Sequence, residues 1–92
     1  MKIIIPETAQ KDIDRLPKEQ KINLLSILIQ LPYAIKNIHQ HSGLGLRKIH
    51  SSGFYEARIG LALRIIFQII NDEIWIKRIG NHYDVERFIK TL

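Results

Sequence analysis

The residues best suited to chemistry are cations in the second half of the chain. Arg58 and Arg64 flank Gly60 in two strand-like segments that should pair as a hairpin, and Lys77 and Arg78 follow in the next segment. An arginine presents a fork of N–H donors that fits the oxygens of a phosphodiester. The pattern is typical of a phosphate-binding surface, and also of exposed cations paired with neighbouring carboxylates.

His82 and Tyr83 follow the last of these segments. A histidine can accept or donate a proton near neutral pH, and a phenol can stack on a base or donate a hydrogen bond. Attack of an RNA 2′-hydroxyl on its own phosphate needs a base, an acid for the leaving oxygen and cations for the developing charge. The region could supply all three. Composition alone favours a structural role, because His and Tyr are common where strands end.

The size and composition of the chain indicate one ordinary globular domain covering 1–92. Its 92 residues are 46% hydrophobic and 25% charged, which argues against disorder. Cysteine is absent, which excludes disulfides and cysteine-based zinc sites and leaves a reducing cytoplasm as the expected location. Neither a signal peptide nor a membrane-spanning stretch is visible. We therefore expect a cytoplasmic protein without membrane contact.

The net charge points to a polyanionic partner. Fourteen Lys and Arg residues against nine Asp and Glu residues give +5 and a pI near 9.8. Such a balance favours nucleic acid or an acidic protein. Many soluble domains carry a similar charge for solubility alone, so the placement of the cations has to decide between these explanations.

The first residues predict a short strand and a short helix. Residues 2–5 form a mainly β-branched run that Pro6 ends. From Thr8, which is suited to an N-cap, apolar residues recur at helical spacing as far as Leu16.

A second helix is predicted from about Lys18 to Leu31, between two prolines. Pro17 suits a first turn, and Pro32 is expected to end the helix. The apolar stripe is wider than one face of a small sheet requires, which indicates either a surface for another chain or a helix packed deep in its own domain. The stripe comprises Ile22, Leu24, Leu25, Ile27, Leu28, Ile29 and Leu31.

Residues 33–45 lose both the helical and the strand period and predict a loop. His39 and His41 lie two apart in this loop, but no cysteine or partnered carboxylate accompanies them. We therefore expect no metal site, and no cofactor.

The second half predicts a four-stranded meander and a final helix. The strands are expected at 46–50, 54–59, 63–70 and 73–79, with Asn71 and Asp72 as a two-residue turn and the third of these strands central. In the last strand, strict alternation places Trp75, Lys77 and Ile79 opposite Ile74, Ile76 and Arg78. Asp84 is expected to cap a helix whose apolar residues are Val85, Phe88, Ile89 and Leu92.

The order β-α-α-β-β-β-β-α is that of an α+β domain, with a small antiparallel sheet, two N-terminal helices on one face and a short C-terminal helix. This order resembles the RelE/ParE superfamily of toxins from bacterial type II toxin–antitoxin systems. The resemblance covers nearly the whole chain. It rests on the segments Leu46-Arg47-Lys48, Phe54-Tyr55-Glu56-Ala57-Arg58-Ile59, Leu63-Arg64-Ile65-Ile66-Phe67 and Ile79-Gly80-Asn81-His82.

The resemblance implies roles for individual residues. Arg64 falls on the arginine with which RelE-like nucleases hold the scissile phosphate, and Arg58 falls on a cationic position of the preceding strand. His82 and Tyr83 resemble the His-Tyr pair of the YoeB branch, which takes part in acid–base chemistry. The expected RNA-binding cations are Arg47, Lys48, Lys77 and Arg78. Two positions depart from RelE: Glu56 replaces a lysine, and Glu86 and Phe88 are the nearest residues to its C-terminal tyrosine.

The implied function is a toxin that cleaves mRNA on the ribosome without a metal. The ParE-like branch of the same fold inhibits DNA gyrase instead, and a catalytically degenerate homologue that only binds its antitoxin is a third possibility. The implied partners are the ribosome, mRNA and a cognate acidic antitoxin, with operator DNA contacted only through the antitoxin. Ile22, Leu25 and Ile29 are the expected antitoxin-binding residues.

Overall fold

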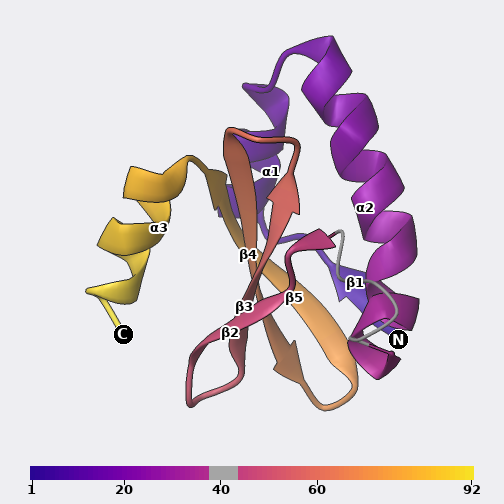
Figure 1. The fold of residues 1–92 in the computed structure, drawn as a ribbon, viewed down its shortest axis with the longest axis vertical. Helices are drawn as coiled ribbons and strands as arrows, with labels where there is room; N and C mark the ends of the chain where they lie inside the picture. The colour runs from indigo at the N-terminus through magenta and orange to yellow at the C-terminus, as the bar shows by residue number, and fades with distance from the viewer. Residues whose placement is uncertain (38–43) are drawn as a thin grey trace.

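The chain folds into a five-stranded sheet of order β1-β5-β4-β3-β2 with helices on both faces (Figure 1). The structure, a computed structural model, describes residues 1–37 and 44–92. The element order and the α+β class confirm the prediction. The elements are β1 (Lys2–Ile4), α1 (Glu7–Asp14), α2 (Lys18–Lys36), β2 (Arg47–His50), β3 (Phe54–Ile59), β4 (Leu63–Ile70), β5 (Glu73–Gly80) and α3 (His82–Ile89).

The sheet is an antiparallel meander of β2 to β5, which β1 joins parallel to β5. Asn71 and Asp72 have φ values of 48° and 64°, so the predicted two-residue turn is confirmed. β4 lies at the centre of the sheet, as expected, and it positions residues on both faces.

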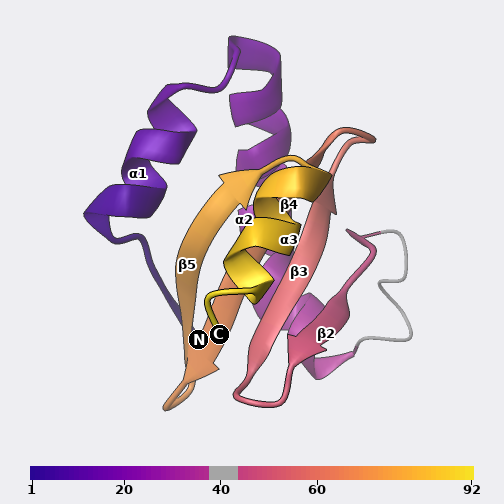
Figure 2. The same cartoon turned by 90° about the vertical axis from the view of Figure 1, so that its left-hand side faces the viewer.

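Two hydrophobic clusters lie on opposite faces of the sheet. On one face, which we call the α2 face, α1 and α2 pack against Ile65, Phe67 and Ile76. On the other, the α3 face, Val85 of α3 packs with Phe54 and Ile66. Figure 2 shows α3 in front of the sheet and α2 behind it. The alternation of β4 explains this arrangement, because apolar residues occupy both of its faces.

Helix α2 continues past Pro32, where the sequence predicted its end. Pro32 removes one backbone hydrogen bond, yet the helix runs to Lys36. The last turn is retained because Leu31 and Ala34, both fully buried, pack in the α2-face core. The predicted loop therefore begins too early, and His39 and His41 lie outside the described residues.

Helix α1 begins at Glu7, so Thr8 is not its N-cap. The N-cap is Pro6, whose side chain offers no capping hydrogen bond, although its carbonyl accepts from Gln10 N at 2.9 Å. Proline serves here because its fixed φ, −64°, suits the residue before a first turn.

A β-bulge in β5 overturns the strict alternation predicted for this strand. Ile66 pairs with Arg78 and Phe67 with Ile76, so Lys77 is the extra residue. Ile76 and Ile79 consequently both reach the α2-face core although they are three residues apart. The predicted grouping of Ile79 with Lys77 was wrong.

Within the described residues, no helix is long and apolar enough to span a membrane.

Candidate nucleic-acid interface

Two arginines stand directly opposite each other at the β3–β4 turn. Arg58 pairs with Arg64 in the antiparallel register, so both side chains leave the sheet on the α3 face, which also carries Phe54 and Ile66. Like charges at directly opposite positions destabilise a strand pair. Within residues 1–37 and 44–92, neither arginine forms an ion pair with a carboxylate. An anion that both guanidinium groups reach would offset their mutual repulsion.

Gly45 sets the course of the Arg58 side chain. Gly45 has φ of +60°, and a Cβ built on it would collide with Arg58 Nε. The arginine therefore lies against bare backbone just before β2. Although its strand position is on the α3 face, it also lines an open cavity of about 470 Å³ with Asn23 and Ser26 of α2. Arg58 is exposed and accessible to a ligand from solvent.

Arg64 lies beside the end of β5. Its Nη1 donates to Leu63 O at 3.3 Å. In the antiparallel pairing of β4 with β5, Arg64 lies opposite Gly80. His82 follows Gly80 by two residues, so its Cα lies within roughly 13 Å of that of Arg64. Side chains of both lengths can reach one phosphate across such a span.

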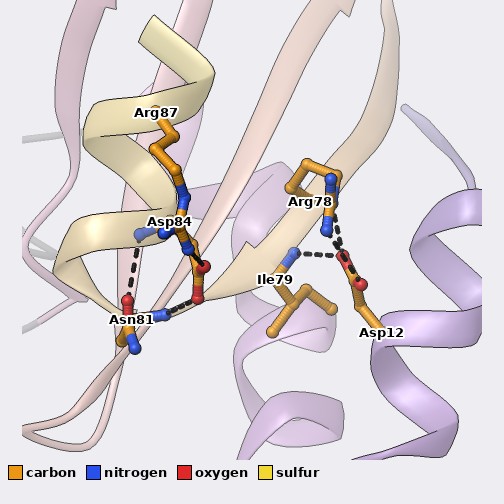
Figure 3. A network of polar contacts seen from close by, with 6 residues as sticks. All are labelled: Asp12, Arg78, Ile79, Asn81, Asp84 and Arg87. Atoms are coloured by element: carbon orange, nitrogen blue, oxygen red, sulfur yellow. Dashed lines mark hydrogen bonds and ion pairs between the residues drawn. The ribbon is translucent and has the colours of Figure 1, made fainter.

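His82 and Tyr83 form the first turn of α3 instead of prolonging the strand, and this corrects the predicted helix start at Asp84. Asn81 is the N-cap: its side chain accepts from Asp84 N at 2.9 Å, while Asp84 Oδ2 accepts from Asn81 N at 2.8 Å (Figure 3). This capping box satisfies two otherwise unpaired donors of the helix start. The hydrogen bond from the Asn81 backbone lowers the pKa of Asp84, and Arg87 adds to the effect.

The capping box was visible in the sequence as Asn81 followed three residues later by Asp84. The predicted cap, Asp84, is instead the third residue of the helix, and Asn81 is the N-cap. At the far end of α3, Val85 is buried as predicted, whereas Leu92 lies beyond the helix and is 42% exposed.

The His82 side chain contacts Glu86 and Tyr83 of its own helix. Its Nε2 lies 3.0 Å from Glu86 Oε1, and its ring meets that of Tyr83 edge-on with centroids 6.2 Å apart. Tyr83 is 69% exposed. Both groups predicted for proton transfer are thus accessible at the helix start, where the backbone N–H groups also favour an anion.

Arg78 is held by a carboxylate that the sequence analysis did not identify. Its Nε donates to Asp12 Oδ2 at 2.8 Å and its Nη2 to Asp12 Oδ1 at 3.4 Å, while Ile79 N donates to Oδ2 at 3.0 Å (Figure 3). Hydrogen bonding to Asp12 raises the pKa of Arg78. Asp12 belongs to α1, 66 residues away in sequence, and no local pattern indicates this contact.

The remaining predicted cations are divided between the two faces. Arg47 is opposite Glu56 and forms an ion pair with its buried carboxylate at 3.0 Å, on the α3 face. Lys48 is opposite Tyr55, which packs on the α2 face, so Lys48 does not share the surface of Arg64. Lys77 lies 5.6 Å from the centroid of the Trp75 ring, as a cation–π contact.

The outer side of α2 carries a second candidate surface. Ile22, Leu25, Ile29 and Tyr33 are 59%, 60%, 64% and 68% exposed, whereas Leu24, Ile27, Leu31 and Ala34 of the same helix face the core. We call the four exposed residues the α2 stripe. A groove of about 620 Å³ runs beside it, lined by Met1, Ile3 and Ile5 and by residues of α2 from Leu25 to Lys36. This exposure excludes the alternative that the whole apolar stripe is packed inside its own domain.

Comparison with known proteins gives structural neighbours but no sequence relatives. No family model matches the chain, and no curated protein matches it. RelE in the archaeal RelE–RelB complex from Pyrococcus horikoshii OT3 superimposes with a TM-score of 0.69 and 19% identity, over 87% of this chain and 92% of that one.

Two further solved structures are equally similar. YafQ from E. coli strain BL21(DE3) gives a TM-score of 0.68 and 18% identity, over 90% of this chain and 94% of that one. The Staphylococcus aureus YoeB–YefM toxin–antitoxin complex gives 0.67 and 19%, over 90% and 98%. At such identities the likeness shows the fold alone. The chain has the fold of these RelE, YafQ and YoeB structures, so the fold that the sequence resemblance implied is confirmed.

Proposed function

We propose that this protein is the toxin of a type II toxin–antitoxin system and cleaves mRNA on the ribosome. The observation that carries the proposal is the pair of directly opposed arginines, Arg58 and Arg64, beside a helix start bearing His82 and Tyr83. The RelE/ParE fold supports the toxin role, because RelE, YafQ and YoeB share it.

The chemistry follows from the groups present. The 2′-oxygen attacks its neighbouring phosphorus while its proton passes to His82. The bond from phosphorus to the 5′-oxygen breaks, and that oxygen takes a proton from the Tyr83 hydroxyl. Arg64 and Arg58 stabilise the charge on the phosphate oxygens. The products are a 2′,3′-cyclic phosphate and a 5′-hydroxyl.

The test is to express the chain in bacteria and map mRNA ends by primer extension. We expect new ends within translated regions, and because they carry 5′-hydroxyls they become ligatable only after phosphorylation. Arg64→Ala and His82→Ala should each lower the cleavage rate by about a hundredfold or more, because each removes a group that acts in the transition state. Lys18→Ala, which removes an exposed cation at the start of α2, is the matched control. Cleavage that is absent, or unaltered by both site variants, contradicts the proposal.

A ParE-like inhibitor of DNA gyrase is the second candidate. It is favoured by the ion pairs of Arg47 and Arg78, which engage two of the cations expected to bind RNA. This function predicts induction of the SOS response and trapped DNA cleavage complexes while protein synthesis continues. Early arrest of translation without DNA damage excludes it.

We further propose that the partner is an acidic antitoxin and that it covers the α2 stripe. Lys18 and Lys36 share the helical phase of the stripe and lie at its two ends, on a protein of net charge +5. An amphipathic segment with an apolar centre and acidic ends complements this surface. RelE and YoeB were each solved together with an antitoxin, RelB and YefM.

The partner proposal is tested by co-expressing the chain with a small acidic protein encoded beside it. Leu25→Asp and Ile29→Asp should weaken copurification at least tenfold, because each places a charge in an apolar contact. Leu61→Asp, at a residue 96% exposed on the β3–β4 turn, is the control for an added surface charge. If both stripe variants bind the partner fully, or if the chain self-associates through the stripe, the proposal that an acidic antitoxin covers the stripe is contradicted.

A further inference from the structure

The contact between His82 and Glu86 favours one tautomer of the ring. Nε2 of His82 lies 3.0 Å from Glu86 Oε1 as an exposed ion pair. An ionised carboxylate accepts hydrogen bonds and donates none, so its charge beside Nε2 favours a proton on that nitrogen. In the neutral imidazole the other nitrogen, Nδ1, is then the unprotonated one.

The two residues lie on one rigid turn. They are four apart in α3, whose start is fixed by the capping box of Asn81 and Asp84. On the strands of this face the charged side chains include Arg58, Arg64 and Arg78, which cannot accept a proton, and Glu56, which is paired with Arg47. The other carboxylate in this half of α3, Asp84, is bound by Asn81 N and Arg87, whereas Glu86 faces the His82 ring.

We propose that Glu86 is a positioning residue for His82: it holds the tautomer in which Nδ1 accepts the proton of the RNA 2′-hydroxyl. The inference rests on the proposed mRNA cleavage and assigns a role to a residue outside the predicted set of catalytic and RNA-binding residues. As the bond from O2′ to phosphorus forms, the proton passes to Nδ1. The bond to O5′ breaks, and its electron pair takes the proton of Tyr83. Glu86 takes no proton and touches no substrate.

Two substitutions separate positioning from simple charge. Glu86→Gln keeps the size of the side chain but removes its charge, while Glu86→Lys places a donor against Nε2 and so favours a proton on Nδ1. Both residues suit an exposed helix position. Glu7→Gln is the control, since Glu7 forms an exposed i, i+4 pair with Lys11 on α1, at 3.6 Å.

The first measurement needs no substrate. Nitrogen-15 NMR of the His82 ring at about pH 8.5, where an imidazole is neutral, reports which nitrogen is protonated. We expect protonation at Nε2 in the native chain and in Glu7→Gln, and a shift toward Nδ1 in Glu86→Lys. A ring with the same tautomer ratio in all three proteins overturns the positioning role.

The second measurement is cleavage of mRNA on purified ribosomes. We expect kcat to fall about tenfold in Glu86→Gln and about a hundredfold in Glu86→Lys, with KM unchanged or lower in Glu86→Lys because a cation attracts RNA. A purely electrostatic role predicts faster turnover at low RNA concentration for Glu86→Lys, and that result contradicts the inference. If the native chain does not cleave, the proposed function fails and the catalytic use of the pair fails with it, while the NMR result still decides whether Glu86 sets the tautomer.

Discussion

Asp12 is the residue on which the junction of α1 and β5 depends most. β1 pairs only with residues 73–75 of β5, so the later part of that strand lacks a neighbour on this side. The Asp12 carboxylate, 8% exposed, supplies the missing acceptor to Ile79 N and also binds Arg78. A helix side chain thus completes the hydrogen bonding of an open sheet edge.

Replacing Asp12 should therefore destabilise the fold. Asp12→Ala leaves the buried Ile79 N–H and the exposed guanidinium of Arg78 without their partner, and we expect a loss of about 1–3 kcal/mol in the free energy of unfolding, mainly from the unpaired N–H. Urea denaturation followed by circular dichroism measures it. Asp12→Asn, which keeps one acceptor oxygen, should lose less, and Glu7→Ala on the exposed side of α1 should change little. If Asp12→Ala is as stable as the native chain, water must accept the hydrogen bond of Ile79 N in place of Asp12.

Residues close in sequence were predicted better than residues far apart. The opposition of Arg58 and Arg64 follows from one tight turn, so strand alternation was enough to predict it. The binding of Arg78 by Asp12 depends on how α1 docks, which no local period encodes. Arg47 and Lys48 show how much depends on the register of β2. A shift of one residue in its pairing with β3 would move each side chain to the other face of the sheet.

At the scale of elements, α3 depends on its cap. Asp84 accepts a hydrogen bond from Asn81 N, pairs with Arg87, and has a lowered pKa in the folded protein. A carboxyl whose folded pKa lies below its unfolded value stabilises the fold above the unfolded pKa, about 4, and loses this contribution as pH falls through the folded pKa.

We therefore expect the acid sensitivity of the native chain to exceed that of Asp84→Asn. The urea midpoint of Asp84→Asn should be lower than native at pH 7, and the difference should shrink as the pH falls below about 4 and through the lowered pKa of Asp84. Amide hydrogen exchange in α3 should rise over the same range if the helix frays first. A gap between the two proteins that stays constant with pH contradicts a role for the charged carboxylate.

Strands were predicted more accurately than the ends of helices. Alternation and turn residues defined β3 and β4 to the residue, because the hairpin signals are local. The bulge at Lys77 was not predicted, because it is defined by the pairing of β5 with β4 and not by the sequence of β5 alone. The predicted helix end at Pro32 was wrong for a similar reason. The hydrogen bond lost at Pro32 is a local effect, whereas the burial of Leu31 and Ala34 that retains the last turn depends on tertiary packing.

At the scale of the whole molecule, the α2 stripe and Arg64 lie on opposite sides of the sheet. The stripe lies on the outside of the helix that covers one face, whereas Arg64 leaves the opposite face (Figure 2). Arg58 starts from the same face as Arg64, but it also lines the cavity beside Asn23 and Ser26 of α2. No residue is shared between the stripe and the arginine pair. Substitutions in separate surfaces usually act independently.

The two surfaces should therefore be separable by mutation. Leu25→Asp should leave growth arrest intact but resist rescue by the acidic partner, because Leu25 is 60% exposed and lies in the stripe. Arg64→Ala should lose growth arrest yet bind the partner with native affinity, since the stripe is unaltered. The double variant should show both defects without further change. Growth curves with each protein under its own inducer, together with copurification, measure both properties. Loss of partner binding in Arg64→Ala would mean that the partner also covers the α3 face, so that it neutralises the protein by occupying the site itself.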